Sequence, residues 1–244
     1  MAGWPCAPPS RHGDLQREGT VRKESLPPHP LTVHEPATLL TDCLLGVLSL
    51  WLAERLRRAT PTGPAAQWLV RVLALTALSA LVGGSYHGFA PNFPSAAANL
   101  WWIATLLIID LLSAALALSL LHECLPASRG HRPWLVLIAL KFAGFAVAAA
   151  LRPVFVVAIM DYGSILLAWT IAALWLRRKW SGWMLAGIGC SVLGALIQQL
   201  RWAPSVHFNH NDLYHVVQAL ALSCIYAAGR RFTQPAAVIP RAII

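Results

Sequence analysis

The stretch AANLWWIATLLIIDLLSAALALSLL, residues 97–121, decides the fold class of this chain. It contains one charged side chain, Asp110, among long runs of apolar residues. A helix needs about 20 predominantly apolar residues to cross the hydrocarbon core of a bilayer. The stretch is therefore long and apolar enough to form a transmembrane helix.

Further segments of similar length and composition lie on both sides of this stretch. The expected helices cover residues 36–56, 67–89, 97–121, 133–151, 154–176, 182–200 and 211–228. A continuous helix over the fourth and fifth segments would be far too long for one crossing, so we expect a tight turn at Arg152 and Pro153. The pattern predicts an all-α, polytopic membrane protein whose residues 34–231 form a bundle of seven transmembrane helices.

The composition of the whole chain agrees with a membrane location. The hydrophobic fraction is 57%, the charged fraction is 12% and the mean hydropathy is +0.57. Soluble domains usually carry about 25% charged residues, so this chain has too little polar surface for a water-soluble protein of its size. We expect an integral, multi-pass protein of the plasma membrane, or of the inner membrane in a bacterium.

The two ends of the chain differ from the apolar region. Residues 1–33 are rich in proline, glycine and mixed charge, without an apolar stretch. Such a composition is typical of a disordered tail. Residues 232–244 are expected to form a short cytoplasmic tail.

Basic residues are unevenly distributed between the two sides of the predicted bundle. Eleven lie in alternate connections and the C-terminal tail, namely Arg55, Arg57, Arg58, Arg129, Arg132, Arg177, Arg178, Lys179, Arg230, Arg231 and Arg241. Only Arg152 and Arg201 lie in the connections on the opposite side. The positive-inside rule therefore predicts an N-out/C-in orientation. This topology explains the formal charge of +9, so we expect no nucleic-acid partner.

Several ionisable residues lie within the predicted helices, where each costs roughly 2.5–3.5 kcal/mol on insertion scales. They are Asp42, His87, Asp110, Lys141, Asp161, Asp212 and His215. In the predicted orientation most of them fall at similar depth in the outer half of the bundle, and Asp110 lies nearer the middle. We therefore expect the functional site in the outer half.

The start of the last helix offers a candidate metal site. Asp212 and His215 share a helix face because they are three residues apart, and Gln218 continues that face. His210 lies about 140° away from His215 on an ideal helix, so it can join the same site only from a cap or an unwound turn. Histidines with nearby carboxylates are a plausible zinc shell. Two other interpretations stay open, namely hydrogen bonds that lock the helices together and an ion or proton pathway.

Lys141 lies in the middle of the fourth expected helix. A buried lysine in a seven-helix protein suggests a retinal Schiff base, but the last helix, which carries that lysine in the rhodopsins, has none here. Pairing with an acidic residue such as Asp110 is the expected arrangement.

Two short motifs resemble those of the CREST superfamily, which includes the alkaline ceramidases, the Per1-like proteins and the progestin and adipoQ receptors. The motifs are GGSYHGF, with Ser85 and His87, and HNDLYHVVQ, with His210 and His215. The chain departs from the family pattern at Gly83 and Asn211. The resemblance implies a seven-helix bundle, zinc-dependent amide hydrolysis in the membrane, and a match of Asp110 to the family's aspartate.

The leading hypothesis is therefore a membrane-embedded, zinc-dependent hydrolase of a lipid amide or a related bond, with membrane lipid around it and a lipid-like substrate. The expected metal ligands are His87, His210 and His215. The expected catalytic residues are Asp42, Ser85, Asp110 and Asp212, with Ser85 stabilising the oxyanion. The alternatives are a non-enzymatic receptor or assembly factor and a proton-coupled transporter.

Overall fold

A computed structural model describes residues 31–59, 63–125, 130–205 and 208–232. In these ranges the regular structure is entirely helical, which confirms the all-α prediction. The helices are α1 (Pro36–Ala59), α2 (Pro64–Phe89), η1 (Ala90–Asn92), α3 (Ser95–Cys124), α4 (Arg132–Leu151), α5 (Phe155–Leu176), α6 (Ser181–Gln199) and α7 (His210–Gly229). The long helices begin and end within three residues of the expected positions. Nearly all of the two expected tails lies outside the described residues.

Local chemistry explains where several helices begin and end. A proline is the first residue of α1 and of α2 and the second residue of α4, where its missing N–H group costs nothing. The helix α5 ends at Arg177, whose φ of 45° places it in the left-handed region and turns the chain towards α6. A capping box starts α7, because Asn209 and Asp212 each bind the other's backbone N–H.

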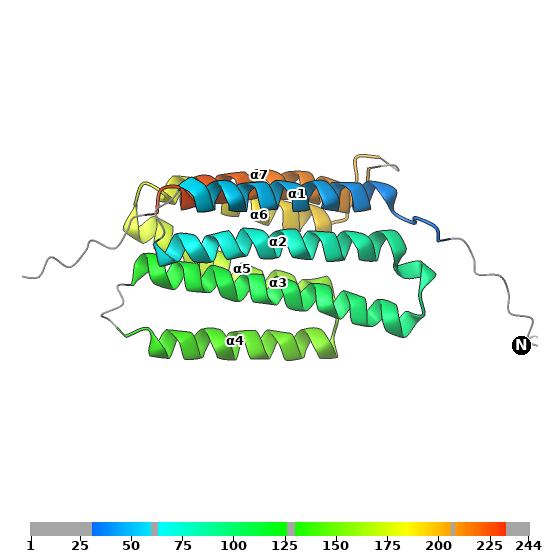
Figure 1. The fold of residues 1–244 in the computed structure, drawn as a ribbon, viewed down its shortest axis with the longest axis horizontal. Coiled ribbons are helices and arrows are strands. Elements are labelled where there is room, and N and C mark those ends of the chain that lie inside the picture. Colours follow the sequence, from blue (N-terminus) through cyan, green and yellow to red (C-terminus); the bar gives the residue numbers. More distant parts are fainter. Residues whose placement is uncertain (1–30, 60–62, 126–129, 206–207, 233–244) are drawn as a thin grey trace, which may run out of the picture. The chain divides into compact units, whose positions relative to one another are not determined.

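The helices pack mainly side by side in chain order, and the bundle closes where the last helix meets the first (Figure 1). The helix α1 packs against α2 and α7, α2 packs against α3, and α6 packs against α7. The helix α5 packs between α3 and α6. The helix α4 packs against α3 and α5, and Ala149 is its one buried residue. The helix α4 therefore lies at the edge of the bundle.

Six helices, α1 to α6, are long and apolar enough to cross a membrane. Large apolar side chains on their outer faces are exposed, including Leu40, Val136, Leu140, Leu167 and Leu193. Soluble proteins rarely expose such extended apolar surface. By length and composition the chain is an integral membrane protein.

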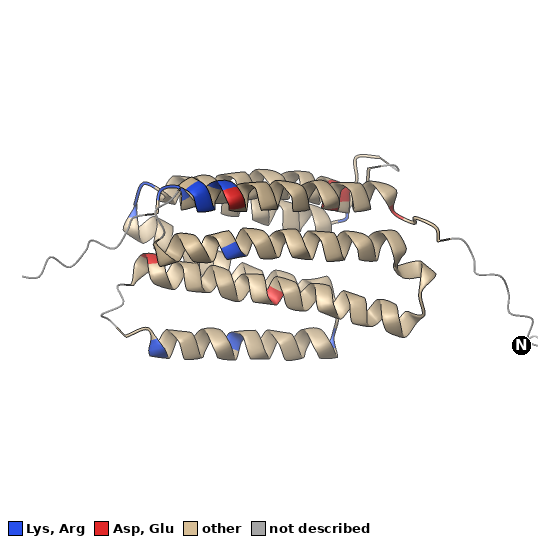
Figure 2. Ribbon diagram, in the orientation of Figure 1, with Lys and Arg blue, Asp and Glu red and all other residues tan. Residues whose placement is uncertain are grey.

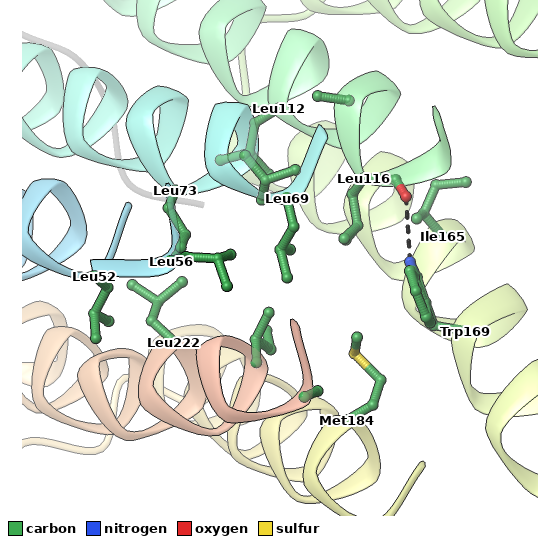
Figure 3. Packing of buried hydrophobic residues seen from close by; sticks show 14 of the residues in the cluster. Leu52, Leu56, Leu69, Leu73, Leu112, Leu116, Ile165, Trp169, Met184 and Leu222 are labelled. Atoms are coloured by element: carbon green, nitrogen blue, oxygen red, sulfur yellow. Dashed lines mark hydrogen bonds between the residues drawn. The ribbon is translucent and has the colours of Figure 1, made fainter. Parts of the chain in front are cut away.

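A tightly packed core fills the end of the bundle where α1 finishes and α2 begins (Figure 3). Leu56, Leu69 and Leu73 from α1 and α2 lie fully buried there. The indole N–H of Trp169 donates a hydrogen bond of 3.2 Å to the carbonyl oxygen of Leu116 and joins α5 to α3. Because this half is filled with side chains, space for a ligand is found in the other half.

Candidate functional site

A cavity of about 590 Å³ lies among α1, α2, α3, α5, α6 and α7. Its described lining residues come from the half of each helix that is remote from the Leu56 core, and none comes from α4. Most of the wall is apolar, with Leu45, Ile109, Phe155 and Leu166 among the lining side chains. A volume of this size is within the range of small-molecule binding pockets.

Four of the expected site residues line this cavity, namely Asp42, His87, His210 and His215. They come from α1, α2 and α7, so the fold brings together residues that are far apart in the sequence. The closest approach is between His215 Nε2 and Asp42 Oδ1, at 3.1 Å. Both side chains are more than nine-tenths buried, so their interaction takes place out of contact with bulk solvent.

The second nitrogen of the His215 ring also has a partner on α1. Its Nδ1 atom lies 2.9 Å from the hydroxyl oxygen of Thr41. That hydroxyl lies 3.1 Å from the carbonyl oxygen of Thr38, to which it donates. A hydroxyl has a single hydrogen, so while that hydrogen is donated to Thr38 the Thr41 oxygen accepts a hydrogen bond from Nδ1–H.

This hydrogen-bond pattern determines the state of the Asp42–His215 pair. With Nδ1 acting as the donor, the neutral ring has its lone pair on Nε2, facing the Asp42 carboxyl group. A contact of 3.1 Å between two acceptors requires a proton between them. In that arrangement Asp42 and His215 share one proton, held either on the carboxyl group or on the ring.

Asp212 does not line the cavity. It holds the start of α7 in place through two hydrogen bonds. Its Oδ1 accepts a hydrogen bond of 2.9 Å from the Thr38 hydroxyl, and its Oδ2 accepts one of 2.6 Å from the Asn209 backbone N–H. Asp212 thus caps α7 and fastens it to α1. This attachment positions His215, one turn further along α7, against Thr41 and Asp42.

His87 and His210 also line the cavity, and both are half-buried. The Nδ1 atom of His87 is 3.5 Å from Glu35 Oε2, and its ring packs edge-on against Tyr86 and Trp102. His210 is the first residue of α7, and its side chain is half-buried. Both histidines therefore belong to the cavity wall, His87 from α2 and His210 from α7.

Two expected site residues lie elsewhere. The Ser85 hydroxyl donates to the carbonyl oxygen of Val82 on its own helix, at 2.9 Å, and Ser85 does not line the cavity. Asp110 is buried and interacts with Asp161 of α5 and Lys141 of α4. Lys141 itself contacts the Asp161 carboxylate, where the sequence had suggested Asp110.

The arrangement of the three histidines does not fit a zinc site that they ligate together. Among the described residues there is no group of three or more His, Cys, Asp or Glu side chains that could hold a metal ion. Both ring nitrogens of His215 are already occupied, by Thr41 and by Asp42. Zinc stays a prediction of the histidine spacing and of the resemblance.

Sequence reasoning missed Thr38, Thr41 and Asn209. Threonine is common in membrane helices, where its hydroxyl can bond to its own backbone, so neither threonine carries a recognisable signal. Asn209 could have been found, since Asn209 and Asp212 have the spacing of a capping box at the start of an apolar helix.

Two cavity-lining residues of α6 are also part of its outer surface. Val192 and Leu196 line the cavity and are also 49% and 52% exposed. Both belong to the apolar surface of a helix that is suited to cross a membrane. The same stretch of α6 thus contributes both to the cavity wall and to the apolar outer surface of the bundle.

Comparison with known proteins places the chain in a family. A model described as a family of unknown function (DUF6962) matches residues 37–234, which include the cavity-lining parts of all six helices. Searches of curated proteins and of solved structures found no match. The chain belongs to the DUF6962 family.

Proposed function

We propose that this protein is a membrane-embedded hydrolase that cleaves an amide or a related bond in a lipid-like substrate, with Asp42 and His215 as its acid–base pair. The observation that carries the proposal is the buried 3.1 Å contact between these two side chains in a cavity of about 590 Å³. A buried acid–base pair in a cleft is a typical feature of a catalytic site.

The proposal includes seven membrane spans, with α7 as the seventh. The helix α7 is not among the six helices that are long and apolar enough by composition, and it carries Asp212, His215 and Gln218. These three side chains are buried within the bundle, so they do not face lipid. The 20 residues of α7 extend about 30 Å, which matches the hydrocarbon core of a bilayer.

The proposed orientation is N-out/C-in. Most Lys and Arg residues of the described chain gather at the end of the bundle that contains the end of α1 and the turn between α5 and α6 (Figure 2). Positively charged connections face the cytoplasm in most membrane proteins. The cavity then lies in the outer half of the membrane.

A lipid-like substrate suits both the wall and the entrance of the cavity. The apolar side chains of Leu45, Ile109 and Phe155 provide a surface for acyl chains, whose burial contributes about 0.8 kcal/mol per CH₂ group. Val192 and Leu196 give access from the bilayer. A substrate can therefore enter from the bilayer between its lipid neighbours and place its polar group near His87 and His210.

The proton shared by Asp42 and His215 supplies the chemistry. Hydrolysis of an amide takes one proton from the attacking water and delivers one proton to the leaving nitrogen. The pair can donate its proton to the nitrogen as the C–N bond breaks and accept the proton of the water as the new C–O bond forms. It then returns to its starting state, and Thr41 keeps the ring oriented throughout.

The resemblance to the CREST superfamily supports an amide as the bond that is cleaved. His87 and His210, which line the same cavity, are suited to bind the polar group of the substrate through ring N–H donors. These two roles rest on the proposed reaction.

The test uses the purified protein in lipid nanodiscs with a panel of fluorescent N-acyl amides and esters. We expect turnover of at least one compound, and we expect Asp42→Asn to lower it by roughly 10²–10⁴-fold. Ser223→Ala is the matched control, because Ser223 lies on the same helix as His215 but is exposed and bonds only to its own helix. Equal turnover in Asp42→Asn and in the control would refute the proposed pair.

A further inference from the structure

A second group of ionisable side chains lies outside the cavity, where α3, α4 and α5 meet. The Lys141 ammonium group donates to the Asp161 carboxylate and, at 2.9 Å, to the hydroxyl of Ser113. The Asp161 side chain is 1% exposed and that of Lys141 is 16% exposed. This contact is therefore an ion pair in the interior of a membrane protein.

Asp110 adds a second carboxyl group to this ion pair. It is 3% exposed, and neither of its carboxyl oxygens has a hydrogen-bond partner among the residues that the structure describes. The same holds for the Oδ2 atom of Asp161. Asp110 is close enough to interact electrostatically with both Asp161 and Lys141. Three buried acceptor atoms thus lie near one another without a donor.

The charges of this group do not balance. Two ionised carboxylates and one ammonium group would leave a net negative charge in surroundings of low dielectric constant, which costs several kcal/mol. The charged groups that act on Asp110 are Asp161 from α5 and Lys141 from α4. Arg71, the basic residue of α2, is exposed and lies over the ring of Trp68, 4.2 Å from its centroid. It does not supply the missing positive charge.

We infer that Asp110 and Asp161 bind one proton between them in the membrane interior, at a site separate from the Asp42–His215 pair. The proton makes one carboxyl group a donor to the other, which satisfies two of the three acceptors and leaves the other carboxylate to Lys141. The same proton removes the excess charge. Asp110 is close in sequence to Ile109 and Leu112, both of which line the cavity. The proton site is therefore on the same helix as part of the cavity wall.

The site also explains how α4 is attached. Apart from Ala149, every residue of α4 is at least partly exposed, so few side chains hold this helix against the bundle. Lys141 is the charged residue in its middle, and its ion pair with Asp161 joins α4 to α5. Loss of the shared proton would place a second negative charge beside that ion pair, so the attachment of α4 depends on the protonation of the site.

Infrared spectroscopy of the full-length protein in nanodiscs tests the inference, because a protonated carboxyl group has a C=O stretching band that a carboxylate lacks. At neutral pH we expect such a band. We expect Asp110→Asn to lower its intensity by the absorbance of one protonated carboxyl group. Glu54→Gln is the control. Glu54 already has Arg57 and Arg58 as partners, at 2.7 Å and 2.6 Å, so its replacement should leave the band unchanged.

A second variant keeps the test decisive if Asp110→Asn does not fold. Lys141→Met removes the only ammonium group of the site, so we expect both carboxyl groups to be protonated and the band to gain one carboxyl group's intensity. A band that is unchanged in both variants would overturn the inference. A band that appears only after Na⁺ or K⁺ is removed would also overturn it, because the site would then bind a metal cation in place of a proton.

Discussion

Gly84 of α2 lies directly against Asp42 of α1. A methyl group at Gly84 would lie 2.5 Å from the Cβ atom of Asp42 and 3.2 Å from its Oδ2 atom. Glycine is therefore the residue that lets α2 approach α1 closely at the level of the proposed acid–base pair. The packing of α1 between α2 and α7 sets the position of Asp42 as much as its contact with His215 does.

Replacing Gly84 with alanine should push Asp42 away from His215. We expect Gly84→Ala to lower the free energy of unfolding by about 1–3 kcal/mol, the usual cost of overpacking, and to reduce turnover. Thermal unfolding in detergent, followed by tryptophan fluorescence, measures the first effect. Gly144→Ala in α4 is the control, since a methyl group there meets no atom within 4 Å. Equal melting temperatures for the two variants would contradict the close approach.

Thr41→Val should disturb His215 without removing it. The valine has no hydroxyl oxygen to accept from Nδ1–H, so the ring loses the bond that orients it. We expect turnover to fall by roughly 10²-fold. Nitrogen-15 NMR of the histidine rings should show a protonated Nδ1 in the wild type and a changed ring state in the variant.

Thr170→Val is the matched control for this prediction. The Thr170 hydroxyl donates to the carbonyl oxygen of Leu166 on its own helix and has no histidine partner. Its replacement should leave both turnover and the His215 signals as they are in the wild type. An unprotonated Nδ1 in the wild type would show that the assigned hydrogen-bond direction is wrong.

The zinc content of the purified protein separates acid–base chemistry from the metal chemistry that the resemblance implies. Because Thr41 and Asp42 occupy both nitrogens of His215, we expect much less than one zinc ion per chain. We also expect turnover to survive treatment with a chelator. Elemental analysis of the wild type and of His215→Ala makes the comparison. One zinc ion per chain, lost in the variant, would establish a metal site in this cavity.

The proposed orientation predicts which connections are accessible from outside the cell. The test starts from a variant in which the 5 native cysteines are replaced. Single cysteines are then introduced as Ala203→Cys, in the connection between α6 and α7, and Lys179→Cys, in the connection between α5 and α6. Both positions are exposed. A membrane-impermeant maleimide should label Ala203→Cys in intact cells and label Lys179→Cys only after permeabilisation. The reverse pattern would invert the orientation.

The sequence predicted the helices well because apolar length is a local property. It predicted the site less completely. The rise of a helix places residues such as Asp42 and His215 at one depth, and the structure does bring these two together. The depth of a residue in the membrane does not determine the direction in which its side chain points around the helix axis. Asp110 is at a compatible depth but faces α4 and α5, and Lys141 reaches Asp161, because the neighbours of each helix decide where its polar face points.

The contact between α1 and α7 has a consequence for the biosynthesis of the protein. The helix α7 is synthesised after the other six, and its buried Asp212 carboxylate accepts a hydrogen bond from Thr38, near the start of α1. Until α7 leaves the ribosome, Thr38, Thr41 and Asp42 lack the partners they have in the finished bundle. While the helices up to α6 are synthesised, α1 must therefore lie in the bilayer with these polar side chains unpaired. A chain truncated before α7 should consequently be a target for membrane quality control.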